Sequence, residues 1–173
     1  MGWKLKPKFG HGGVMNTRIS LLALASVFVV GTVAAQAQDP FVGTWKQNMA
    51  KSSYDPANLA SKTGTTVKRE ASGSGYKLTA DGASAQGAAT HTEYTAATLD
   101  GKDYPVKGSA DYDAVTIKRI NSTTLISVYK KGGTAVRMLR TVVSKDGKTS
   151  TSDQVGYNAQ GIAYHHVTVF DKP

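Results

Sequence analysis

The sequence contains no cysteine among its 173 residues. This absence excludes thiol nucleophiles, cysteine-ligated zinc and iron–sulfur clusters, and it means that no disulfide can hold the fold together. Histidine and proline are also scarce, with four and five residues respectively. Stability must therefore come from a packed core and from closed backbone hydrogen bonding.

Long hydrophobic runs are absent too, with one exception near the N-terminus. Residues 19–33 are apolar or small, Arg18 precedes them, and the small-x-small sequence Ala35-Gln36-Ala37 follows. This order predicts a signal peptide over residues 15–37, cleaved after Ala37. A retained transmembrane anchor is the alternative, because the run approaches the roughly 17 residues that span a bilayer. Residues 1–14 are expected to be a dispensable extension or a mis-assigned start.

Residues 38–173 have the length of one domain with its own core. We expect this domain to be exported, periplasmic or secreted, monomeric, and without an integral membrane anchor after cleavage. Four of the 21 basic residues and none of the 12 acidic residues lie in residues 1–37, so the domain carries about +5. Its basic pairs split between the two faces of strands and no aromatic platform accompanies them, so we expect no nucleic-acid binding.

Turn-forming pairs recur at short intervals along the domain. Asp81-Gly82, Gly132-Gly133 and Asp146-Gly147 are typical of tight hairpins. The segments between such pairs have strand length and no helical periodicity. This pattern predicts an all-β fold, an antiparallel up-and-down meander barrel of about 8–10 strands, because closure removes exposed sheet edges. A two-sheet sandwich is the alternative.

About ten strands are expected, and one short helix is expected to begin at Ala57, after Asp55-Pro56. The expected strands cover residues 41–48, 65–71, 76–80, 90–96, 103–108, 114–120, 123–130, 134–144, 149–157 and 162–170.

The two ends of the domain carry a more specific pattern. Residues 41–46 read F-V-G-T-W-K, and the last expected strand leads into VTVFDK, residues 167–172. With ten hairpin-linked strands, this resembles the lipocalin and fatty-acid-binding-protein (calycin) superfamily. The resemblance implies a barrel in which Gly43 permits a close chain crossing and Trp45 closes the core. The domain is also similar to small secreted bacterial lipocalin-like proteins of unassigned function, which share segments such as DGKDYPV.

One position pair differs from the fatty-acid-binding pattern. In that family an Arg-x-Tyr pair in the last strand holds the ligand carboxylate. The matching positions here are Thr168 and Phe170. The resemblance therefore implies the barrel without this clamp.

The strand at 134–144 carries two arginines on opposite faces. Side chains alternate along a strand, so either Arg137 or Arg140 must face inward. The face of Arg140 has the more apolar neighbours, which favours Arg140 as the inward residue. A buried guanidinium needs an acid, and Glu93, Glu70 or a ligand acid are the candidates. A position at the barrel rim, with the guanidinium in solvent, is the alternative.

Aromatic and histidine side chains complete the candidate site. Tyr94, Tyr129 and Tyr164 lie in strands with small and polar neighbours, which predicts a polar-aromatic cavity. Structural packing of the individual rings is the alternative. His165 and His166 are adjacent and should point to opposite faces, so we expect no metal site and no cofactor.

These patterns favour an exported, non-catalytic protein that binds a small amphipathic or acidic ligand. An envelope structural or interaction protein with a side-chain-filled barrel is the first alternative. The second is a small barrel enzyme with an inward His–acid pair, such as His166 with Glu93. The candidate ligand-binding residues are Arg140, Arg137, Tyr94, Tyr129, Tyr164, His166 and Glu93.

Overall fold

The computed structural model describes residues 38–173, so the expected leader lies outside the described residues. The domain is all-β, with two single-turn 3-10 helices and no longer helix in this range. Neither turn approaches what a membrane-spanning helix requires. The elements are β1 Gly43–Gln47, η1 Met49–Lys51, β2 Ser53–Asp55, η2 Ala57–Leu59, β3 Thr66–Ser72, β4 Gly75–Ala83, β5 Ala89–Ala96, β6 Asp100–Lys107, β7 Ala114–Asn121, β8 Thr124–Lys131, β9 Thr134–Val143, β10 Thr149–Tyr157 and β11 Ala163–Asp171.

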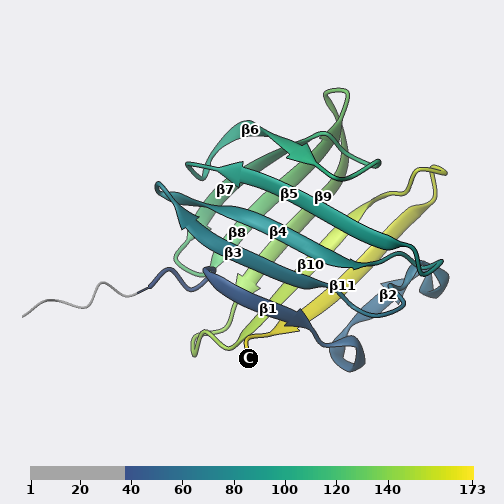
Figure 1. Ribbon diagram of the computed structural model, residues 1–173, viewed down its shortest axis with the longest axis horizontal. Helices are drawn as coiled ribbons and strands as arrows, with labels where there is room; N and C mark the ends of the chain where they lie inside the picture. Colours follow the sequence, from purple (N-terminus) through teal and green to yellow (C-terminus); the bar gives the residue numbers. More distant parts are fainter. Residues whose placement is uncertain (1–37) are drawn as a thin grey trace, which may run out of the picture. The chain divides into compact units, whose positions relative to one another are not determined.

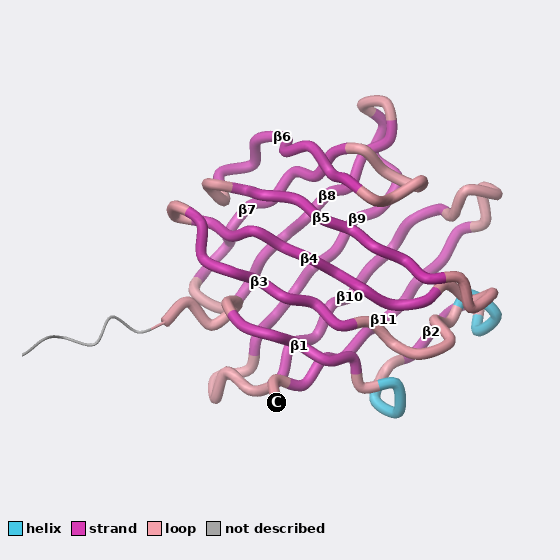
Figure 2. Tube along the Cα trace, viewed as in Figure 1, coloured by secondary structure: helices cyan, strands magenta, loops and turns pink. Residues whose placement is uncertain are grey.

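Ten of the strands form a closed antiparallel up-and-down barrel (Figure 1). From β3 to β11 each strand pairs with its neighbour in sequence, and β1 pairs with both β3 and β11. The tube trace in Figure 2 shows how these strands continue from one to the next through short loops. The predicted meander barrel is confirmed, and the sandwich is excluded because the ring closes on itself.

β1 and β2 lie along the same edge of β11, as two parts of one interrupted strand. Gln47 of β1 is paired with Phe170, and Ser53 of β2 is paired with Val167. The turn η1 takes up the residues between them. β2 was not predicted from the sequence, because three residues carry no alternation that could be recognised.

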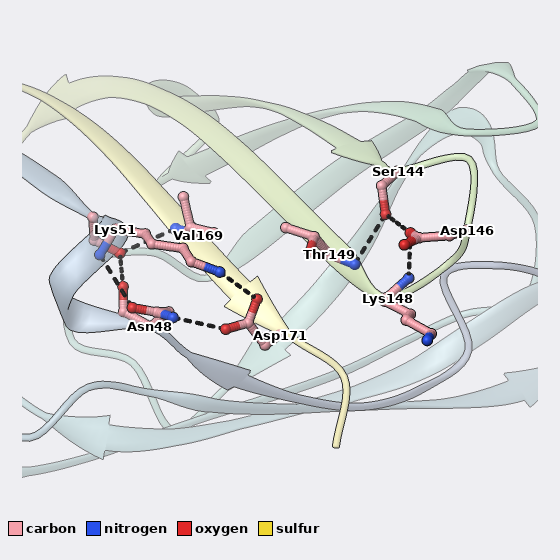
Figure 3. Close-up of polar contacts among 9 residues, drawn as sticks. Asn48, Lys51, Ser144, Asp146, Lys148, Thr149, Val169 and Asp171 are labelled. Carbon is pink, nitrogen blue, oxygen red and sulfur yellow. Dashed lines mark hydrogen bonds and ion pairs between the residues drawn. The ribbon is translucent and has the colours of Figure 1, made fainter.

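Side-chain hydrogen bonds hold this seam and the β9–β10 turn (Figure 3). Asn48 accepts a hydrogen bond from the backbone N–H of Lys51 at 3.1 Å, which caps η1. Its Nδ2 donates to Asp171 at 2.7 Å and lowers the pKa of that carboxyl. At the β9–β10 turn, Asp146 accepts from the backbone N–H of Lys148 at 3.1 Å.

One end of the barrel is closed by Phe41 and Trp45, which are both 0% exposed. Trp45 Nε1 donates to the carbonyl oxygen of Phe41 at 3.0 Å. Lys172 Nζ lies 4.5 Å from the centroid of the Trp45 ring and donates to two backbone carbonyls just before Gly43. Gly43 has φ 129°, and a Cβ there would lie 3.2 Å from Lys172 Cε. The F-x-G-T-W-K segment and the C-terminal Lys172 therefore lie together at the end of the barrel that Trp45 closes.

The predicted turn at Asp81-Gly82 is wrong, because both residues lie inside β4. The chain reverses later, between Ala83 and Ala89. A Cβ on Gly82 would lie 2.9 Å from the carbonyl oxygen of Gly64, so this glycine provides space for the loop that leads into β3. The short helix predicted at Ala57 is confirmed as η2.

Candidate functional site

A cavity of about 460 Å³ lies in the barrel interior and reaches the end opposite the start of β1. The β4–β5 and β6–β7 connections form part of its wall, as does the segment between η2 and β3. The volume falls within the roughly 300–1,000 Å³ of small-molecule pockets. A fully side-chain-filled barrel would leave no such space.

Arg137, and not Arg140, is the arginine of β9 that faces the cavity. Leu139 and Thr141 share its face and are buried, whereas Arg140 is exposed and Met138 is 50% exposed. The prediction that Arg140 points inward is therefore wrong. Its premise, that the more apolar face must be buried, fails because much of a protein's outer surface is apolar.

The guanidinium of Arg137 is surrounded by aromatic rings and has no acid partner. Its Cζ lies 5.0 Å from the centroid of the Tyr129 ring and 5.8 Å from that of Tyr112. Nε is sheltered from solvent and has no hydrogen-bond partner. Among residues 38–173, no carboxylate forms an ion pair with Arg137.

The predicted tyrosines occupy different depths. Tyr129 lines the cavity, whereas Tyr94, which is 3% exposed, and the partly buried Tyr164 do not. Burial raises the pKa of Tyr129 to about 12 and raises that of Tyr94 well above its usual value. Both phenols are therefore neutral at physiological pH, and neither supplies the negative charge that Arg137 lacks.

The acids predicted to pair with the inward arginine lie on the outer face. Glu93 forms an ion pair with Lys77 at 2.8 Å, which lowers the pKa of Glu93. Glu70 pairs with Lys68 at 2.9 Å and is exposed. Both predictions are wrong for the same reason, since each glutamate alternates with residues that point inward. Within the described domain, the one acid in the cavity wall is the exposed Asp111.

The two adjacent histidines point to opposite faces, as predicted: His166 is buried and His165 is exposed, although His166 does not line the cavity. The His166 ring stacks on Tyr164 at 4.5 Å and meets Tyr54 edge-on at 4.8 Å. Its Nε2 is sheltered and has no hydrogen-bond partner. The pKa of His166 is lowered, first by burial and then by the charge of Arg137. Glu93 lies on the opposite face of the barrel wall, so the predicted His–acid pair does not form.

This lowered pKa should make the fold sensitive to acid. As pH falls below about 6.5, the unfolded chain takes up a proton at His166 before the folded chain does, so folding stability decreases. We expect His166→Gln to reduce the dependence of the free energy of unfolding on pH, by up to about 1.4 kcal/mol per pH unit. Urea unfolding between neutral pH and pH 5 measures it. His165→Gln is the matched control, and equal slopes for both variants would contradict the assignment.

The wall formed by β9, β10 and β11 is polar and internally hydrogen-bonded. Thr141 Oγ1 lies 2.9 Å from Ser152 Oγ, and Gln154 Nε2 donates to Thr168 Oγ1 at 3.3 Å. Thr168 and Phe170, at the positions of the fatty-acid clamp, both line the cavity. The last strand, β11, thus contributes no arginine or lysine to the cavity wall, and Arg137 comes from β9 instead.

Most of the cavity lining was missed by sequence reasoning, and two of the missed residues, Arg69 and Tyr112, bear directly on the charge of the site. Arg69 shares the inward face of β3 with Val67, so the period of two could have identified it. Tyr112 lies in the β6–β7 loop and reaches the cavity, where its hydroxyl lies 3.2 Å from Thr92 Oγ1. No strand pattern could have placed a loop residue there.

No known family, characterised protein or solved structure matches the chain. Within residues 38–173 no three potential histidine or carboxylate ligands lie together in a way that could hold a metal ion.

Proposed function

We propose that this chain is an exported, lipocalin-like barrel protein that binds a small amphipathic acid in its cavity without catalysis. The ligand's acidic group would pair with Arg137. Its apolar part would lie against Tyr129 and Leu139, and its polar atoms would face Gln154 and Thr168, which all line the same cavity.

The observation that carries the proposal is the unpaired guanidinium of Arg137. Arginine remains charged at any physiological pH, so this charge cannot be removed by deprotonation. A sheltered charge without a partner is unfavourable, and an acid that enters the cavity would relieve this cost. Tyr129 and Tyr112 stabilise the cation in part through their ring faces, but they leave Nε without an acceptor.

Two further features support binding over the alternatives. The cavity exceeds the lower limit of about 300 Å³ for ligand pockets, which favours a binding barrel over a filled one. A catalytic role would need an acid to orient a base, and His166 has no carboxylate partner among the described residues. His91 in the cavity wall does lie 2.7 Å from Asp81, but both of these side chains are more than half exposed. Trp45, which is 0% exposed and closes one end of the barrel as the resemblance implies, supports the lipocalin-like assignment.

The test is calorimetric titration of residues 38–173 with cinnamate, phenylpropionate and octanoate, each compared with its primary amide. The amide keeps the shape of the acid but lacks the charge. We expect at least one acid to bind about 10-fold more tightly than its amide, because a charge-assisted hydrogen bond is lost. Equal binding of every acid and its amide, or no binding by any of them, would contradict the proposal.

A further inference from the structure

A second inward guanidinium, that of Arg69, lines the same cavity from another wall. Arg69 lies on β3 and Arg137 on β9. In the closed sheet order, five strands separate β3 from β9 in one direction and three in the other. The two arginines therefore face the cavity from roughly opposite sides of the barrel.

Arg69 has the same unsatisfied chemistry as Arg137. Its Nε is sheltered and has no hydrogen-bond partner. Its Cζ lies 5.7 Å from the centroid of the Tyr76 ring. The adjacent Glu70 is turned outward and pairs with Lys68, and no other described carboxylate forms an ion pair with Arg69.

A row of buried tyrosines, which we name the tyrosine floor, connects the two arginines. It consists of Tyr76, Tyr94 and Tyr129, exposed by 1%, 3% and 6%. Tyr94 lies 6.3 Å from Tyr76 and 6.3 Å from Tyr129, measured between ring centroids. Arg69 lies over the first ring of this row and Arg137 over the last. An arginine thus lies at each end of this row of rings, and the last ring, Tyr129, lines the cavity together with both arginines.

From this arrangement we infer that the ligand is a dianion, with two acidic groups separated by an apolar or aromatic middle. One group pairs with Arg137 and the other with Arg69. A monoacid would satisfy Arg137 and leave the second, partly buried cation without a partner. This inference depends on the proposed function, which it makes more specific.

The test compares adipate, suberate and sebacate with hexanoate, octanoate and decanoate by calorimetry on residues 38–173. For the diacid of best length, we expect binding at least about 10-fold tighter than that of the monoacid of equal length, since a second charge-assisted contact forms. If every diacid binds no more tightly than its monoacid, the dianion inference is wrong while the proposed function stands. If neither class binds, the proposed function itself is wrong.

Substitution of Arg69 tests whether this residue makes the contact with the second acidic group. Arg69→Gln should remove the advantage of the diacid and change monoacid affinity by no more than about 2-fold, because the two contacts are separate. Lys68→Gln, on the adjacent outward position, is the matched control and should change neither. A retained diacid advantage in Arg69→Gln would overturn the inference. If that variant does not fold, which circular dichroism would show, the wild-type comparison of diacids with monoacids decides alone.

Discussion

Replacing Trp45 with alanine is expected to lower the free energy of unfolding by about 3–5 kcal/mol, the largest stability effect predicted for this domain. Trp45 is 0% exposed and closes one end of the barrel. Its removal would leave a cavity beneath Phe41. It would also remove the ring that faces Lys172 and the indole donor to the Phe41 carbonyl. Urea unfolding followed by far-ultraviolet circular dichroism measures the change.

The control for this variant is Tyr157→Ala, also an aromatic truncation but at a residue that is 62% exposed. Its effect should stay within about 0.5 kcal/mol, as is usual for surface positions. A loss below about 1 kcal/mol for Trp45→Ala would mean that Trp45 does not close the core. The assignment of residues 41–46 as the opening of the barrel would then lack its physical basis.

Replacing Arg137 with alanine is expected to weaken binding of the preferred acid by about 10- to 100-fold, because a buried charge-assisted contact is lost. The same change should not reduce folding stability in the absence of ligand, since it removes an unpaired sheltered charge rather than breaking an ion pair. Calorimetric titration gives the first quantity and urea unfolding the second.

Arg140→Ala provides the matched control for Arg137→Ala. Arg140 lies on the same strand but on the exposed outer face, so the variant removes the same charge from the domain without reaching the cavity. Its ligand affinity should remain within about 2-fold of the wild type, apart from small screened long-range effects. If both variants weakened binding equally, the acid would be held by surface charge and the cavity would not be the site.

The fold could be predicted from the sequence because its local signals agree with one another. The expected strand at 149–157 has the same bounds as β10, where alternation and the flanking turns are both clear. Asp81-Gly82 misled the prediction because it has the composition of a turn, whereas Gly82 serves a close backbone approach inside β4. Such an approach depends on Gly64, 18 positions away, and leaves no local signal.

The candidate site was predicted less well than the fold, and the errors have a common cause. Alternation correctly established that one of Arg137 and Arg140 faces inward, but it could not decide which. Which arginine faces inward depends on how β9 is paired with β8 and β10, where Arg137 is opposite Tyr129 and Gly156. Glu93 was chosen for its charge alone, and its own strand places it outside with Lys77.

Binding of an organic acid to the guanidinium groups inside the barrel should be visible at the arginine side chains themselves. The most direct measurement is a ¹H–¹⁵N spectrum of the arginine Nε–H groups of residues 38–173 during titration with suberate, with signals assigned from Arg69→Lys, Arg137→Lys and Arg140→Lys. We expect the Arg137 and Arg69 signals to shift and saturate together, while that of Arg140 stays in place. Movement of the Arg140 signal alone, or no movement at Arg137 at any suberate concentration, would contradict binding at this site.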